Sequence, residues 1–174
     1  CLAAVEGIVQ AHGGVVDKYI GACVMALFGV PNAIENAPRQ ALNAAIAIRQ
    51  RLQDFNREEA LPVALDVHMG VNTGLVIAGE IGGRVKRDFT VMGDTVNLAS
   101  RIKDAAAAGV IHVGPETHRY TKDAFDFGDP QHLTLAGKAQ QVPVYVLASQ
   151  RRSVHRTATA PIVETEPLAA ARRD

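Results

Sequence analysis

The spacing of apolar residues changes along this chain of 174 residues, and this change constrains the fold more than any other feature. In residues 34–56, apolar side chains recur at helical intervals, which predicts a long helix with one buried face. From Val63 to Val71, apolar and polar residues alternate, which predicts a strand with one buried face. Because both patterns occur in turn, we expect a mixed α/β fold.

The remaining elements are predicted from the same periodicities and from Gly and Pro punctuation. Helices are expected over 2–12, from Asp94 and from Pro115. A hairpin is expected from strands 15–20 and 23–28, and further strands over 74–78, 88–92, 110–113, 133–135 and 144–147. The apolar periodicity then stops, so we expect one domain over 1–147 and a flexible polar tail or linker over 148–174.

Composition excludes several classes of protein. Hydrophobic residues make up 48% of the chain, which favours a globular domain, and 18 basic residues balance 18 acidic ones. The balance argues against a polycationic surface for nucleic acid. Uncharged runs are too short to cross a bilayer, and two cysteines are too few for a disulfide framework. We therefore expect a cytoplasmic domain, with a membrane or sensor region possible only outside this stretch.

The segment GDTVNLASR, residues 93–101, has the most specific local chemistry. Asp94 is expected to be the N-cap of a helix. Asn97 and Arg101 lie four residues apart, and with Asp104 they form one polar stripe. Near a helix start such donors favour an anion, although a solvated helix face has the same pattern.

Common nucleotide and metal motifs are missing from the sequence. Gly137-Lys138 is followed by Ala139 and has no upstream glycine at Walker A spacing, and residues 79–83 do not match a dinucleotide fingerprint. The six histidines do not pair with Cys or carboxylates at ligand spacing, so a zinc site is not expected. Any nucleotide that the chain binds must therefore be held in another way.

Five phrases nevertheless occur in a specific order: HGGVVDKYIG, VMALFG, GVNTG, AGEIG and GDTVNLASR. In this order they strongly resemble the class III adenylate and guanylate cyclases, over residues 1–147. The resemblance implies a ferredoxin-like βαββαβ domain that works as a homodimer with composite active sites. It also implies conversion of ATP or GTP to the 3′,5′-cyclic monophosphate and pyrophosphate. Two divalent ions, Mg²⁺ or Mn²⁺, held by two aspartates, would assist attack of the ribose 3′-oxygen.

The resemblance also assigns roles to individual residues. Asn97 would position the ribose, and Arg101 would neutralise charge on the α-phosphate. Lys18 and Thr90 stand where the family reads the base; a lysine donor and a threonine oxygen suit adenine, so ATP is the expected substrate. Lys138 would replace the family's triphosphate-binding residue, whose own position holds Ala136.

The sequence departs from the family pattern at both metal-binding aspartates. Ala22 stands where the family has a metal-binding aspartate, and a methyl group binds no cation. The second aspartate belongs to a first strand expected before Cys1, so the predicted fold is truncated at its N-terminus.

Three alternatives follow. The chain is a working adenylate cyclase in which Ala22 was introduced to trap substrate, or it is a naturally degenerate cyclase that dimerises and regulates a partner. A diguanylate cyclase is disfavoured because the Gly-Gly-Asp/Glu-Glu-Phe signature is missing.

Overall fold

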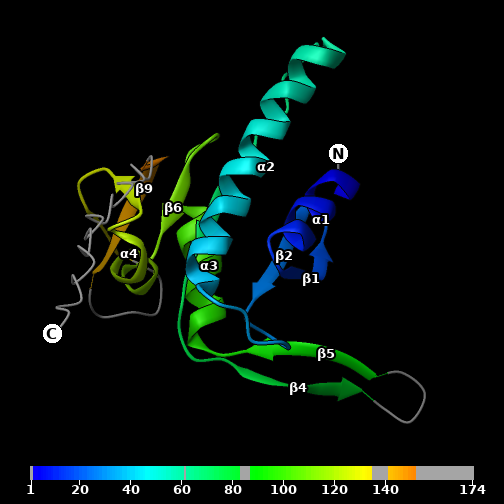
Figure 1. Cartoon of the computed structure of the whole chain (residues 1–174), viewed down its shortest axis with the longest axis vertical. Coiled ribbons are helices and arrows are strands. Elements are labelled where there is room, and N and C mark those ends of the chain that lie inside the picture. Colours follow the sequence, from blue (N-terminus) through cyan, green and yellow to red (C-terminus); the bar gives the residue numbers. More distant parts are fainter. Residues whose placement is uncertain (1, 61, 83–86, 135–140, 152–174) are drawn as a thin grey trace, which may run out of the picture.

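The computed structural model describes the backbone of residues 2–60, 62–82, 87–134 and 141–151, and their side chains except at 80–82 and 87–90. The fold is mixed α and β, as predicted (Figure 1). The helices are α1 (Leu2–Ala11), α2 (Ala37–Glu59), α3 (Asp94–Asp104) and α4 (Pro115–Thr121). The strands are β1 (Gly14–Ile20), β2 (Cys23–Phe28), β3 (Met69–Val71), β4 (Ile77–Gly82), β5 (Arg87–Met92), β6 (Ile111–Val113), β7 (Phe125–Phe127), β8 (Gln131–Leu133) and β9 (Val142–Gln150).

The first strands form the predicted antiparallel hairpin. Ile20 pairs with Cys23, so only Gly21 and Ala22 form the turn, and Gly21 takes a φ of 61° that favours glycine. A bulge interrupts the register between Val16 and Lys18. α1 and α2 lie beside this hairpin (Figure 1).

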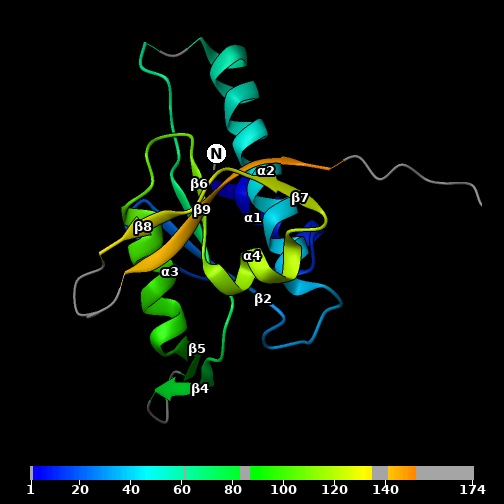
Figure 2. The same cartoon turned by 90° about the vertical axis from the view of Figure 1, so that its left-hand side faces the viewer.

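A second sheet joins distant parts of the chain. β3 pairs in parallel with β6, β6 and β7 both pair antiparallel with β9, and β8 pairs with β9 (Figure 2). α2 and this sheet share the main core, formed by Leu42, Ala45, Ile111, Val113, Phe125 and Leu147. α2 therefore contacts both the hairpin and the second sheet, and holds them together.

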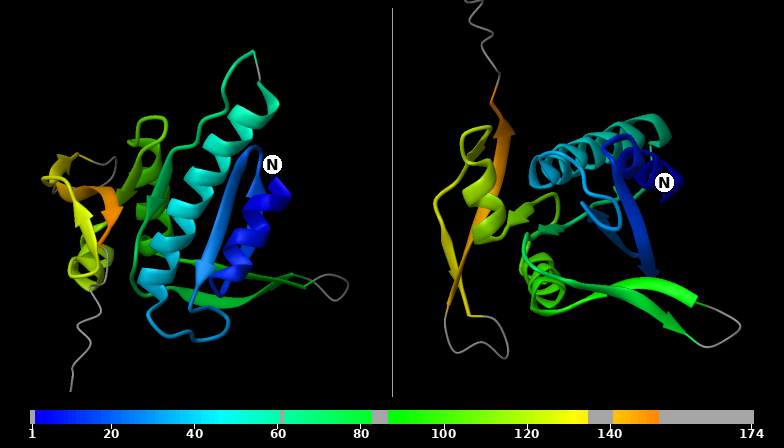
Figure 3. Two further views of the ribbon diagram at one scale, coloured as in Figure 1. Left: turned by 45° about the horizontal axis from the view of Figure 1, so that its top comes forward. Right: turned by 60° about the horizontal axis from the view of Figure 1, so that its bottom comes forward.

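The hairpin of β4 and β5 projects from the rest of the domain as an arm (Figures 1 and 3). Ile77 pairs with Met92 at its base, and both side chains are exposed, Ile77 by 71% and Met92 by 49%. Leu75, just before the arm, is 95% exposed. We call Leu75, Ile77 and Met92 the arm surface.

The strand predicted over 63–71 is wrong for most of its length, since only Met69–Val71 forms β3. Its partner β6 is three residues long, so the ladder ends there. In the preceding segment Val63 is 78% and Leu65 is 42% exposed. Alternation therefore identified residues suited to a strand, but no described strand pairs with 62–68.

Smaller differences concern the ends of elements. Asp94 is the first residue of α3 and not its N-cap, because the carbonyl of Gly93 accepts the amides of Val96 and Asn97. α2 begins later and ends later than predicted, and β7 was not predicted. β9 continues to Gln150, beyond the expected end of the domain at 147. Among the described helices, none is long and apolar enough to cross a bilayer.

α3 packs against β3 at Gly70, where the two backbones approach closely. A Cβ atom at Gly70 would lie 2.5 Å from the carbonyl oxygen of Ala99 and 2.5 Å from the amide nitrogen of Lys103. Helix backbone atoms cannot move away as a flexible side chain can. The absence of a side chain at residue 70 therefore sets the distance between helix and strand.

Gly70→Ala is expected to destabilise the domain, because the new methyl group must push α3 away from β3. The expected cost is about 1–3 kcal/mol, which is a fall in Tm of about 3–10 °C. Thermal unfolding followed by circular dichroism checks this. Gly79→Ala is the matched control, because a Cβ there meets no atom within 4 Å; equal stability of the two variants would contradict the prediction.

Candidate functional site

α3 is fixed at its start by two hydrogen bonds to the segment that follows β3. The Thr95 hydroxyl donates to the carbonyl of Leu75 at 2.6 Å. The Asn72 side-chain amide donates to the carbonyl of Thr95 at 3.0 Å. Gly93 enters the helix with a φ of 135°, which few other residues adopt. The first turn of α3 therefore has a defined position relative to the sheet.

Asn97 and Arg101 lie one helical turn apart on α3, as predicted. Asn97 is exposed, Arg101 is half-buried, and Ile102 is fully buried on the other face of the helix. Within the part of the chain that the structure describes, no residue forms a hydrogen bond or ion pair with either side chain. Their donors are therefore available to a ligand, and guanidinium and amide groups suit phosphate and hydroxyl oxygens.

Asp104, the third member of the predicted polar stripe, is engaged elsewhere. Its carboxylate contacts the Lys103 ammonium at 2.5 Å. This hydrogen bond raises the pKa of Lys103 above its usual value. Asp104 is thus paired with its neighbour and does not neutralise Arg101.

Lys18 and Ala22 both lie on the β1–β2 hairpin. The Lys18 ammonium lies 3.1 Å from a carboxylate oxygen of Asp17. Ala22 is exposed in the turn. Cys23, the next residue, makes a small electrostatic contribution that raises the pKa of Lys103 on α3, less than that of Asp104.

Two predicted residues have no side-chain geometry to report. Thr90 lies on β5, where its backbone pairs with Gly79, but its side chain is outside the described residues. Lys138 lies in 135–140, which is also outside them. The roles predicted for both residues remain predictions.

The described residues do not fit a two-metal site. No group of three or more His, Cys, Asp or Glu side chains that could hold a cation occurs among them. Ala22 supplies only a methyl group where the family resemblance requires a carboxylate. Among the described residues, the available chemistry is therefore hydrogen-bond donation to polar or anionic ligand atoms, without a complete metal centre.

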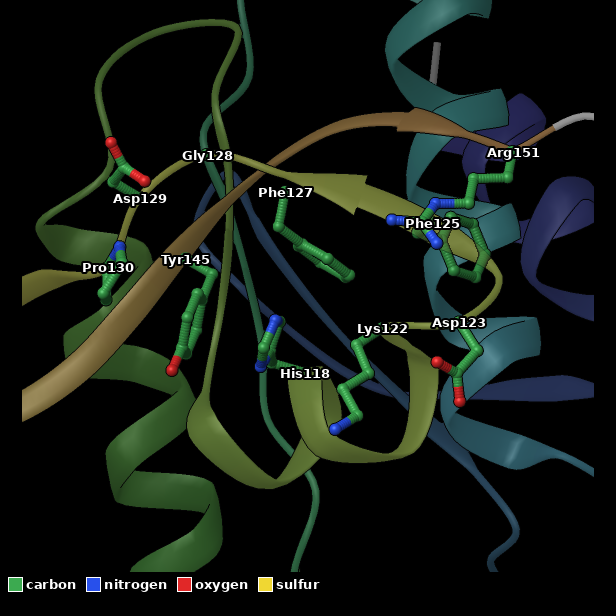
Figure 4. A pocket seen from close by; sticks show the side chains of 10 residues that line it. All are labelled: His118, Lys122, Asp123, Phe125, Phe127, Gly128, Asp129, Pro130, Tyr145 and Arg151. Atoms are coloured by element: carbon green, nitrogen blue, oxygen red, sulfur yellow. The ribbon is translucent and has the colours of Figure 1, made fainter.

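Two cavities of about 380 Å³ each lie away from these residues. One lies between α4, β7 and β9, where His118 stacks on Tyr145 with ring centroids 3.7 Å apart (Figure 4). Burial, with a smaller effect of Lys122, lowers the pKa of His118. The other lies at the start of α2 beside Arg39 and Tyr120. Neither of these two cavities is lined by Asn97, Arg101 or Lys18.

Sequence reasoning did not identify every residue that shapes this surface. Asn72 and Thr95 belong to two of the quoted phrases, but no role was assigned to them. Asp17 directly precedes Lys18 and was also passed over. The only sign of their importance in the sequence was that they lie inside the quoted motifs. Hydrogen bonds between distant segments, such as those of Asn72 and Thr95, depend on the three-dimensional arrangement and cannot be read from the sequence.

Comparison with known proteins agrees with this geometry. Adenylate cyclase 1 of Rhizobium meliloti (strain 1021) is 34% identical over 157 residues, covering 86% of this chain and 23% of that protein. The adenylate cyclase of Anabaena cylindrica is 38% identical over 108 residues, covering 59% of this chain and 20% of that protein. The crystal structure of the adenylyl cyclase CyaB from P. aeruginosa superposes with a TM-score of 0.81 at 31% identity, covering 87% of this chain and 80% of that one.

The chain thus spans about a fifth to a quarter of the length of these curated relatives. Residues 3–149 match the family model described as the adenylate and guanylate cyclase catalytic domain. With the matching fold and the predicted residues on α3, this match shows that the chain belongs to the adenylate and guanylate cyclase catalytic domain family.

Proposed function

We propose that this chain is an adenylate cyclase domain, which forms 3′,5′-cyclic AMP and pyrophosphate from ATP. In the reaction the ribose 3′-oxygen bonds to the α-phosphorus, and the bond to the β-phosphate bridging oxygen breaks. The observation that carries the proposal is the donor pair of Asn97 and Arg101, which no described residue engages, on a helix whose start is fixed. The names of the two adenylate cyclase relatives support ATP over GTP.

Each side chain has a role that suits its chemistry. Asn97 orients the ribose, and Arg101 stabilises the charge that develops on the α-phosphate oxygens. A guanidinium suits this task because its planar N–H groups can donate hydrogen bonds to two oxygens at once. Lys18 and Thr90 bind the adenine ring, and Lys138 contacts the triphosphate.

Ala22 makes a second function a serious alternative: a catalytically degenerate domain that dimerises, binds nucleotide and regulates a partner. The supporting observation is that residue 22 is alanine, which supplies no oxygen ligand for a cation. Mg²⁺ or Mn²⁺ is the cofactor that we expect a complete site to take, and a complete site needs an oxygen ligand at residue 22. We therefore expect the chain to bind ATP but to convert it to cyclic AMP only slowly.

We also propose that the domain works as a homodimer. Asn97 is exposed, and neither of the two cavities described above includes it or Arg101, so a second chain would help to enclose a nucleotide bound there. The arm surface of Leu75, Ile77 and Met92 is the best candidate for the contact, because apolar side chains this exposed are commonly covered by a partner.

Ala22→Asp is expected to raise cyclic AMP formation by about 100-fold or more when made in a chain extended before Cys1 to include the expected first strand. The physical reason is that a carboxylate restores an oxygen ligand. Cyclic AMP is measured by chromatography with Mg²⁺ or Mn²⁺ present, and Ala26→Asp on β2 is the control for added charge. A restored protein that binds ATP but stays inactive would favour the regulatory alternative, whereas production of cyclic di-GMP would overturn both.

Arg101→Lys in the Ala22→Asp background is expected to lower kcat by about 100-fold with little change in KM. A lysine keeps the charge but loses the fixed donor fork. Ser100→Ala, an exposed change on the same helix, should leave the rate unchanged. If Arg101→Lys raised only KM, Arg101 would be a ground-state binding residue instead.

Ile77→Asp is expected to convert the dimer to a monomer, because a charge would be buried in the proposed contact. Sedimentation velocity over a range of concentrations measures this, with Tyr120→Asp as the control because Tyr120 is 59% exposed on α4, outside the arm surface. Unmodified chain that sediments as a monomer at all concentrations would rule out the homodimer.

A further inference from the structure

Asp17 is a buried carboxylate in a position where strands seldom hold one. Its side chain is only 2% exposed, on β1 of the first hairpin. The oxygen Oδ2 accepts no hydrogen bond from the part of the chain that the structure describes. Its charge partner is Lys18, whose Nζ lies 3.1 Å away without the alignment of a hydrogen bond. The contact is therefore an ion pair.

The bulge in β1 explains how two consecutive residues can form this pair. In a regular strand, neighbouring side chains point to opposite faces. Here Val16 pairs with Ala26 and Lys18 pairs with Met25, so Asp17 is the extra residue. A bulge re-aims the side chains around it. The irregularity thus brings the Asp17 carboxylate and the Lys18 ammonium together on one side.

Asp17 and Lys18 differ in solvent exposure, and this difference indicates which of the two side chains is held in place. The Lys18 side chain is 39% exposed, whereas that of Asp17 is almost fully buried. A buried carboxylate is costly unless a charge or hydrogen bond compensates it. Asp17 cannot reach water to find another partner, whereas a lysine has a flexible four-carbon stem. Asp17 is therefore the anchor and Lys18 is the group that it holds.

We propose that Asp17 is a positioning residue that orients the Lys18 ammonium toward the nucleotide base and so sets the preference for ATP over GTP. The inference rests on the base-reading role of Lys18 in the proposed function. An ammonium has three donors, so it can face Asp17 and still donate to a ring nitrogen of adenine. The nearby carboxylate also offsets its charge, which lowers its attraction to the phosphates that ATP and GTP share.

The test compares ATP and GTP binding to the full chain by isothermal titration calorimetry. Asp17→Asn keeps the shape but removes the charge, and we expect it to weaken ATP binding about three- to tenfold. GTP binding should change by less than about twofold, since the loss acts through base reading. Asp123→Asn, an exposed change, should alter neither. Lys18→Gln should abolish the effect of Asp17→Asn.

The inference would be overturned if Asp17→Asn weakened ATP and GTP binding equally, or if it weakened ATP binding by the same factor in the Lys18→Gln background. Asp17 would then be a structural residue. If Asp17→Asn fails to fold by circular dichroism, Asp17→Ser is used in the same scheme. Failure of the unmodified chain to bind ATP would contradict the proposed function instead. The contact between Asp17 and Lys18 is also tested without nucleotide, by ¹³C relaxation at Lys18 Cε. Equal mobility of Lys18 in the unmodified chain and in Asp17→Asn would show that Asp17 does not hold it.

Discussion

The close approach of α3 to β3 at Gly70 is the contact on which the rest of the site depends. Helix and strand meet backbone to backbone, with no side chain of residue 70 between them. Such a contact cannot adjust by a change of rotamer, so it fixes the distance of α3 from the sheet. Asn97 and Arg101 are presented by the opposite, solvent-facing part of this helix. Their position is thus determined by packing on the other side of the same helix.

Hydrogen bonds orient α3, which the packing contact at Gly70 alone does not do. The segment after β3 is bonded to α3 through Asn72 and through the carbonyl of Leu75. It is also bonded to α4, because the hydroxyls of Thr73 and Thr117 lie 2.8 Å apart. A short segment between two helices therefore sets their relative rotation. Donors prearranged in this way need little reorganisation when charge develops on a ligand.

Sequence patterns predicted elements well where the signal was local. The β1–β2 hairpin follows from Gly21 between two apolar runs, and α3 from its periodicity after Gly93. Prediction failed over 62–68, because alternation shows what a strand could bury but not whether a partner strand exists. The ion pair of Asp17 with Lys18 was equally out of reach, since it depends on a bulge. The residues on α3 could be proposed as site residues because they belong to one motif of the sequence.

The position of Ala22 shows why the residue there has little influence on the fold. Residue 22 lies exposed in a two-residue turn whose shape depends on the positive φ of Gly21. An aspartate there would contribute little to folding, because exposed turn side chains bury no apolar surface. Gly70, in contrast, cannot change without disturbing α3. Stability therefore constrains α3, which bears Asn97 and Arg101, whereas the turn at residue 22 can change without loss of the fold.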